Sequence, residues 1–209
     1  MDNWDYSYLC SLIDEANEKQ KQYPFSPPDE EGADISYIPS KLKLHWPGAI
    51  GSLHFRYEME KYHICERRKL RKDAQNYFRI VRKAGKIVRI DTFVHGRLVV
   101  IFLMHYEGNK RYAFPFSRTG GFYPSYTQVQ VYDDSGDIAE DYMVRSKQIV
   151  HYRYSKCAPN TVQEHLIIYF NRHQDPVNHK EVGHYTLGDS LIYTEEWHWT
   201  WNGLCLDKK

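Results

Sequence analysis

The chain has 209 residues, of which 42% are hydrophobic and 26% are charged, and its formal net charge is +1. This composition is typical of a folded globular protein and differs from that of disordered or low-complexity chains. The length fits one domain or two small ones packed closely, and we predict a single domain, 1–209. A net charge near zero creates no overall field that would attract nucleic acid or an anionic membrane. Aromatic residues make up 15% of the chain, which favours β-structure and protein interfaces.

The N-terminus gives no sign of export, because its first residues are acidic and are not followed by a basic and then an apolar run. The apolar run 98–104 has the length of a strand and is too short to span a membrane. Four cysteines are scattered along the chain without a Cys-x-x-Cys pair: Cys10, Cys65, Cys157 and Cys205. Such spacing is typical of reduced thiols, so we expect a cytoplasmic protein with no membrane association.

The first segment, 1–23, carries the helical pattern of the chain. Its apolar and aromatic residues recur at helical spacing: Trp4, Tyr8, Leu12, Ile13 and Ala16. Pro24 ends this pattern, and the segment 24–40 is rich in proline and acidic residues. Because proline cannot donate a hydrogen bond within a central strand, the sequence predicts a solvated linker over 24–40.

From about residue 41 the pattern changes to the alternation of half-buried strands, and we predict a first β-meander over 41–116. The expected strands lie at 53–62, 77–82, 87–94, 97–106 and 111–114. The chain turns at 83–86, and the pair His95-Gly96 between two β-rich runs is typical of a two-residue hairpin, since glycine readily adopts the positive φ that such a turn needs.

A loop around 115–124 precedes a second meander with terminal strands, predicted over 125–206 and including an irregular, histidine-rich stretch between 170 and 191. The sequence therefore predicts a mainly β fold, in which antiparallel meanders form a curved or two-layer sheet and one N-terminal α-helix covers part of it.

The turns 106–109, Gly85-Lys86 and 95–97 resemble the hairpin repeats of the MORN type and of related bacterial antitoxin and immunity β-repeat proteins. The resemblance extends over about residues 77–155, although the strands are longer than in those repeats. It implies a curved sheet that works by binding another protein and performs no chemistry of its own.

The sequence contains no assignable catalytic site, because it has no Gly-x-Ser-x-Gly motif and no cysteine in an activating signature. Three histidines, His173, His179 and His184, lie near Asp175 and Glu181, and these residue types can bind a metal. Their spacing matches no standard zinc site. We therefore expect no enzymatic activity, no cofactor and no metal.

Basic residues dominate the segment 61–89, where only Glu66 and Asp73 oppose them. Interleaved aromatic residues make a nucleic-acid surface conceivable. A solvated turn and a sheet edge protected by positive charge explain the same pattern, and we favour this explanation. The predicted partners accordingly exclude nucleic acid.

The opposite charge gathers on the first hairpin of the second meander, at Asp133, Asp134, Asp137, Glu140 and Asp141. Mutual repulsion of these carboxylates costs stability unless a cationic partner neutralises them; the run is either a solvated turn or a surface that docks into a basic protein cleft. Near the C-terminus, alternation places Trp197, Trp199 and Trp201 on one face of a strand. They either cover the core or anchor a partner.

These features predict a non-catalytic protein-binding module, an immunity protein that neutralises a cognate toxin by occluding its active site. The alternative is a small-ligand-binding β-barrel protein or an enzyme with a pocket lined by Tyr, Trp and His. A deep pocket enclosed by the strands would favour the alternative. A filled interior with a charged, aromatic outer face would favour the immunity protein.

Overall fold

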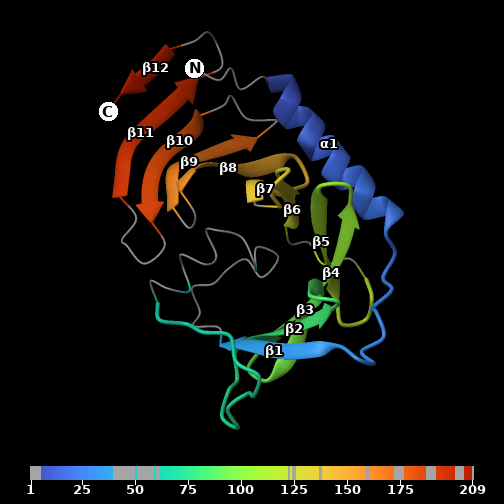
Figure 1. The fold of residues 1–209 in the computed structure, drawn as a ribbon. Coiled ribbons are helices and arrows are strands. Elements are labelled where there is room, and N and C mark those ends of the chain that lie inside the picture. Colours follow the sequence, from blue (N-terminus) through green and yellow to red (C-terminus); the bar gives the residue numbers. More distant parts are fainter. Residues whose placement is uncertain are drawn as a thin grey trace. The chain divides into compact units, whose positions relative to one another are not determined.

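In a computed structural model, the structure describes residues 6–39, 50, 59, 62–121, 123, 126–136, 138–158, 161–171, 177–186, 192–200 and 205–208, with side chains described between 8 and 149. The chain is mainly β, and within each of its two meanders every strand pairs antiparallel with the next one along the chain (Figure 1). One helix, α1 (Tyr6–Gln22), lies at the N-terminal end. The predicted fold class, antiparallel meanders with one N-terminal helix, is confirmed.

The chain divides into two compact units, one formed by residues 1–22 with 127–209 and the other by residues 23–126. The boundary between residues 126 and 127 falls between the two predicted meanders, and the helix belongs with the second meander. The expectation of a single domain stays a prediction. Among the described residues, no helix is both long and apolar enough to cross a membrane.

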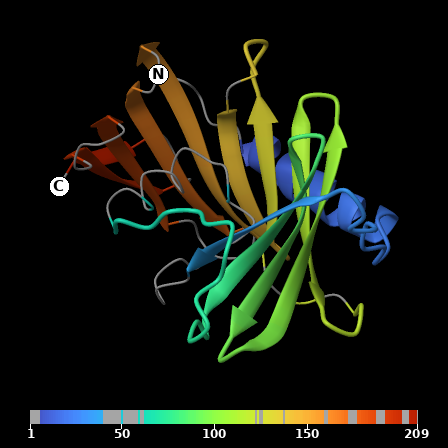
Figure 2. The same cartoon turned by 60° about the horizontal axis from the view of Figure 1, so that its bottom comes forward.

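The described residues of the unit 23–126 form a meander of five strands in chain order (Figure 2). These are β1 (Asp34–Pro39), β2 (Tyr77–Lys83), β3 (Lys86–Val94), β4 (Arg97–Glu107) and β5 (Lys110–Ser117). In the turn between β3 and β4, His95 and Gly96 both have positive φ, 49° and 71°, as a two-residue hairpin with this twist requires. The hairpins predicted here from the sequence are confirmed.

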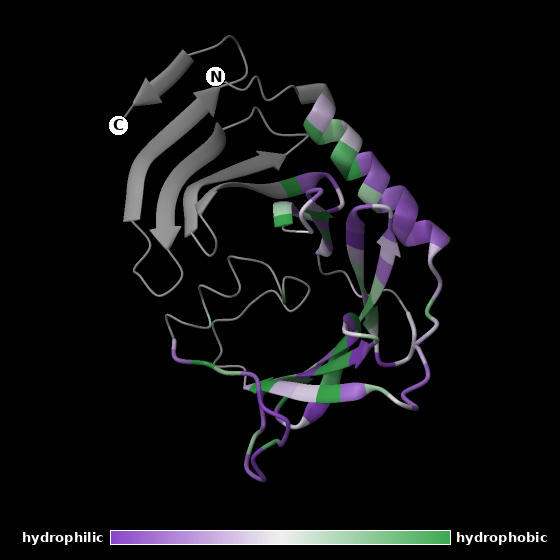
Figure 3. Ribbon diagram, in the orientation of Figure 1, coloured by the Kyte–Doolittle hydropathy of each residue, from purple (hydrophilic) through white to green (hydrophobic). Residues whose placement is uncertain are grey.

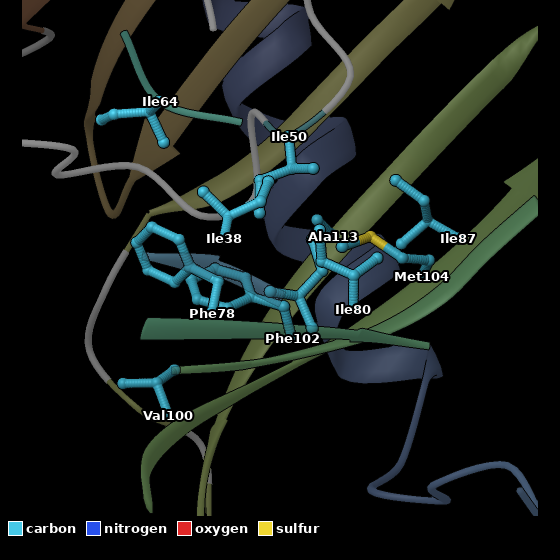
Figure 4. Packing of buried hydrophobic residues seen from close by; sticks show 11 residues of the cluster. Ile38, Ile50, Ile64, Phe78, Ile80, Ile87, Val100, Phe102, Met104 and Ala113 are labelled. Atoms are coloured by element: carbon cyan, nitrogen blue, oxygen red, sulfur yellow. The ribbon is translucent and has the colours of Figure 1, made fainter. Parts of the chain in front are cut away.

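One face of this sheet packs into an apolar core whose members come mainly from β1 to β5 (Figure 4). The cluster consists of Ile38, Ile50, Ile64, Phe78, Ile80, Ile87, Ile90, Val100, Phe102, Met104 and Ala113. Strand β4 is buried on both faces from Val100 to Met104, so its sequence is a continuous apolar run without alternation.

The other face of the same sheet is covered by the residues that follow α1. The Tyr23 ring stacks on His105 with centroids 4.0 Å apart, and the Phe25 ring packs against Phe116 at 5.4 Å. Gly120 lies so close that a Cβ there would be 2.8 Å from the Phe25 ring. These contacts fix the segment 23–30 on the sheet.

The prediction of a solvated linker over 24–40 is wrong in part, because residues Asp34–Pro39 form β1 and pair with β2. The side chains of β1 alternate, with Ser36 and Ile38 buried. Pro39 is the last residue of this strand, where the missing N–H of proline matters least. The strand predicted at 53–62 falls mostly outside the described residues. Tyr62 itself lies in a turn.

The other unit joins α1 to a second meander in chain order. Its strands are β6 (Thr127–Tyr132), β7 (Ile138–Arg145), β8 (Gln148–Ala158), β9 (Thr161–Asn171), β10 (Val177–Thr186), β11 (Ile192–Thr200) and β12 (Cys205–Lys208). The histidine-rich stretch is not irregular throughout, because β10 pairs with both β9 and β11. Backbone pairing on both sides holds this polar strand in the sheet.

Helix α1 packs against β6, β7 and β8. It buries Leu9, Leu12, Ile13 and Ala16, which lie on one face at helical spacing. Asn17 also donates a side-chain hydrogen bond of 2.8 Å to the carbonyl of Ser146, in the turn between β7 and β8. The predicted helix within 1–23 is thus confirmed, and the second meander positions it.

Candidate functional site

The turn between β6 and β7 carries the predicted acidic cluster. Asp133 and Asp134 are exposed, and the Asp133 carboxylate accepts hydrogen bonds from the backbone N–H of Ser135 (3.0 Å) and from its hydroxyl (2.7 Å). A further bond of 2.9 Å runs from the Gly136 N–H to the Asp133 carbonyl. The acidic turn 133–136 is therefore ordered by its own hydrogen bonds and holds its carboxylates in solvent.

The structure separates the five predicted acidic residues. Asp141 is only 2% exposed and accepts a hydrogen bond from the buried Gln128 side chain, so it is not available to a partner. Glu140 is half-buried and accepts a hydrogen bond of 3.1 Å from the Tyr8 hydroxyl of α1. Asp137 lies outside the described residues. The part of the cluster that the structure shows as exposed is Asp133 with Asp134.

The predicted aromatic anchors lie on or beyond β11. Trp197 and Trp199 are two residues apart on this strand, opposite Lys180 and Asn178 of β10, so the backbone places them on one face. Their side chains, and all of Trp201, are outside the described part. The interpretation of these tryptophans as core or as anchor stays open.

The histidine-rich segment is described only through its backbone. His179 pairs with His198 across β10 and β11, and His184 pairs with Ile192, while His173 is outside the described residues. Within the described side chains, no group of three or more His, Cys, Asp or Glu is placed to hold a metal ion.

A buried ionic network, which the sequence analysis missed, lies on the sheet of the 23–126 unit. Asp91 of β3 is 1% exposed and accepts hydrogen bonds from Arg89 (2.6 Å) and from Arg79 (3.0 Å). Glu30, in the segment before β1, binds both arginines from the solvent side. The Arg79 hydrogen bond, more than any other cause, lowers the pKa of Glu30 below its usual value.

A second acidic residue is also satisfied internally. Glu66, one of two acidic residues in the basic segment 61–89, accepts a hydrogen bond of 3.0 Å from Arg82 and one from the Ser36 hydroxyl. The arginines of β2 and β3 are therefore largely neutralised by the fold. Those of the segment 62–74 are different, because Arg67, Arg68 and Arg71 are exposed and form no ion pair with any described residue.

A cavity of about 280 Å³ lies where this segment meets β1. Its apolar lining comes from Tyr37, Pro39, Ile64, Leu70 and Ala74. Its polar lining comes from His63, Cys65, Arg67, Lys69 and Arg71. The run of basic residues in the sequence indicated the segment 61–89. Nothing in the sequence indicated that β1 lines this cavity, because residues 34–39 were expected to belong to a linker.

Comparison of the chain with protein-family models, with curated proteins and with solved structures gives no match.

Proposed function

We propose that the chain is a non-catalytic protein-binding module of the immunity class, which neutralises a cognate toxin by occluding its active site. The observation that carries this proposal is the acidic turn 133–136, whose exposed Asp133 and Asp134 project from an ordered hairpin. A basic cleft of the kind that acts on nucleic acid or nucleotides is the partner surface that such a turn complements.

Preorganisation supports this proposal. The hydrogen bonds within the turn mean that little backbone freedom is lost when a partner binds it. Helix α1 packs on β6 and β7, the two strands that the acidic turn connects, and so supports the hairpin. Exposed carboxylates on a rigid hairpin increase the rate of association with a basic surface and make it depend on salt.

The test begins with the full chain, tagged and expressed in its native organism, and with identification of the protein it captures. That protein, expressed alone, should arrest growth, and co-expression of the chain should restore growth. Association rates of the purified pair are then measured at low and at physiological salt. The variant Asp133→Asn with Asp134→Asn should associate roughly 3- to 10-fold more slowly at low salt, with a flatter salt dependence.

The matched control is Asp29→Asn with Asp34→Asn. Both residues are exposed, and Asp29 accepts a hydrogen bond from a backbone N–H two residues ahead, as Asp133 does. The control removes the same charge and should change the rates by less than about twofold if only the acidic turn steers the partner. Equal rates for wild type and the turn variant at both salts, or a captured protein that is not toxic, would refute the proposal.

A further inference from the structure

The cavity beside β1 combines an apolar floor with a cationic rim. Ile64, which lines the cavity, also belongs to the core cluster, so the cavity adjoins the packed interior. Figure 3 shows the rest of the segment 62–74 as largely hydrophilic. The rim includes Arg67, Lys69 and Arg71, all exposed and none in an ion pair with a described residue. Repulsion among them is relieved when an anion binds.

The walls of the cavity are held in place by hydrogen bonds of the main chain. Tyr37 of β1 and Arg67 exchange two of them, each 2.8 Å long, which fasten the segment 62–74 to the strand (Figure 2). A turn bond of 3.1 Å runs from the Ala74 N–H to the Arg71 carbonyl. The Tyr37 ring packs edge-on against Tyr77, with centroids 6.1 Å apart. A ligand would therefore meet a largely preformed site.

The acidic residues nearest in sequence do not compete with such a ligand. Glu66 is bound to Arg82 and Ser36, and Asp73 is exposed but does not line the cavity. The cationic residues that line the cavity, Arg67, Lys69 and Arg71, are thus available to an anion. Guanidinium groups can donate paired hydrogen bonds to phosphate oxygens. No acidic residue lines the cavity, so no carboxylate on its lining competes with a phosphate for these donors.

We propose that this cavity binds a small phosphorylated compound with a flat apolar body, and specifically a nucleoside monophosphate. The phosphate lies on Arg67 and Arg71, and the base lies on the floor made by Tyr37, Ile64 and Leu70. The cavity volume of about 280 Å³ lies just below the range for drug-sized sites, about 300–1,000 Å³, which suits a ligand no larger than one nucleotide unit. This site is independent of the acidic turn and of the proposed immunity function.

The first test is titration calorimetry of the full chain at physiological salt, with adenosine monophosphate, inorganic phosphate and adenosine as separate titrants. Adenosine monophosphate should bind at least about tenfold more tightly than either of the others, because only it uses both floor and rim. The absence of binding at millimolar nucleotide, or equally tight binding of inorganic phosphate, would overturn the proposal.

A pair of matched variants locates the site. Arg67→Gln with Arg71→Gln should weaken binding at least about tenfold, the loss expected when charged hydrogen bonds to phosphate are removed. The control, Arg68→Gln with Lys72→Gln, removes the same charge from exposed residues that do not line the cavity. It should leave binding within about twofold of wild type. An equal loss in both variants would show a diffuse charge effect and overturn the site.

Cys65 provides a second measurement that does not depend on these substitutions. It is a free, exposed thiol and lines the cavity. Alkylation at Cys65, followed by mass spectrometry, should slow severalfold when adenosine monophosphate saturates the protein, whereas inorganic phosphate at the same concentration should change it little. An unchanged alkylation rate under saturation would place the nucleotide elsewhere and overturn the assignment.

Discussion

Replacing Asp91 with asparagine tests whether the buried ionic network stabilises the sheet of the 23–126 unit. The Asp91 carboxylate receives hydrogen bonds from Arg79 and Arg89, whose side chains are only 18% and 16% exposed. Asparagine keeps the size of the side chain but removes the charge. Its one carbonyl oxygen accepts from one guanidinium, and its amide group then presents N–H donors to the other.

The expected loss follows from these contacts. A hydrogen bond to a charged group contributes about 1.5–3 kcal/mol, and removal of one partner from a buried ion pair costs about 3–5 kcal/mol. Glu30 remains on both arginines and offsets part of this loss. We therefore expect Asp91→Asn to lower the free energy of unfolding by about 2–3 kcal/mol, which corresponds to a fall in Tm of roughly 4–12 °C for a chain of this size.

The matched control is Glu30→Gln, which removes a carboxylate from the same two arginines. Glu30 is 37% exposed, so its loss should cost no more than about 1 kcal/mol. Thermal and urea unfolding of the three proteins, with hydrogen exchange on β2 and β3, measure the difference. Equal losses from the two variants, or a loss below about 1 kcal/mol for Asp91→Asn, would show that burial of Asp91 does not determine the energetics of the network.

Two further predictions concern the same unit. Burial lowers the pKa of His105, and its Nε2 has no hydrogen-bond partner in the described part of the chain. Because the unfolded chain binds the proton more readily, the free energy of unfolding should fall as the pH drops below about 6.5. In urea unfolding from pH 5 to 8, His105→Phe should remove the contribution of this histidine to the pH dependence. Ala84 has a φ of 48° in the hairpin turn before Gly85, so Ala84→Asn should raise the free energy of unfolding by about 0.5–1 kcal/mol, and a lower urea midpoint would contradict the turn geometry.

The hairpins and the helix could be predicted because the information that specifies them is local. The turn at His95-Gly96 places β3 and β4 in register within a few residues, and the glycine there needs no distant partner. The helix likewise shows its buried face through residues at helical spacing, such as Leu9, Ile13 and Ala16. Patterns of this kind can be recognised from neighbouring residues alone.

Strands that depend on distant partners were missed. β1 pairs with β2, and even the two paired residues that are closest in sequence, Pro39 and Tyr77, are 38 positions apart. Its proline-rich approach suggests a linker, and only the pairing with β2 and the bridge from Tyr37 to Arg67 show that a strand and a cavity wall form there. β10 was missed for a similar reason, because neighbouring strands on both sides stabilise a polar sequence that has no apolar alternation of its own.

In the candidate site, the sequence likewise could not show which charged residues are exposed and which are buried. Asp133 and Asp141 belong to one acidic run in the sequence, yet Asp133 is exposed in the turn and Asp141 is buried beside Gln128. Sequence proximity cannot distinguish these two states, since the partner that satisfies Asp141 lies on the neighbouring strand. The exposed part of the predicted surface is consequently smaller than the run of acidic residues indicates.

Each of the two meanders has a buried aspartate that faces a polar residue on the preceding strand, Asp91 on β3 and Asp141 on β7. Asp91 of β3 lies directly opposite Arg79 of β2, and Asp141 of β7 lies directly opposite Gln130 of β6. In both hairpins a buried carboxylate of the later strand therefore faces a polar residue of the earlier strand. A slip of one residue would move Asp91 to the face opposite Arg79 of β2, while Arg89 of the same strand would move with it, and it would move Asp141 to the face opposite Gln128 of β6. Because the loss of a hydrogen-bond partner from a buried carboxylate costs free energy, these pairs add to the cost of a shifted register. Each hairpin therefore has one register that provides its buried acid with its cross-strand donor, and in the second meander that register also sets the position of Asp133 in the turn.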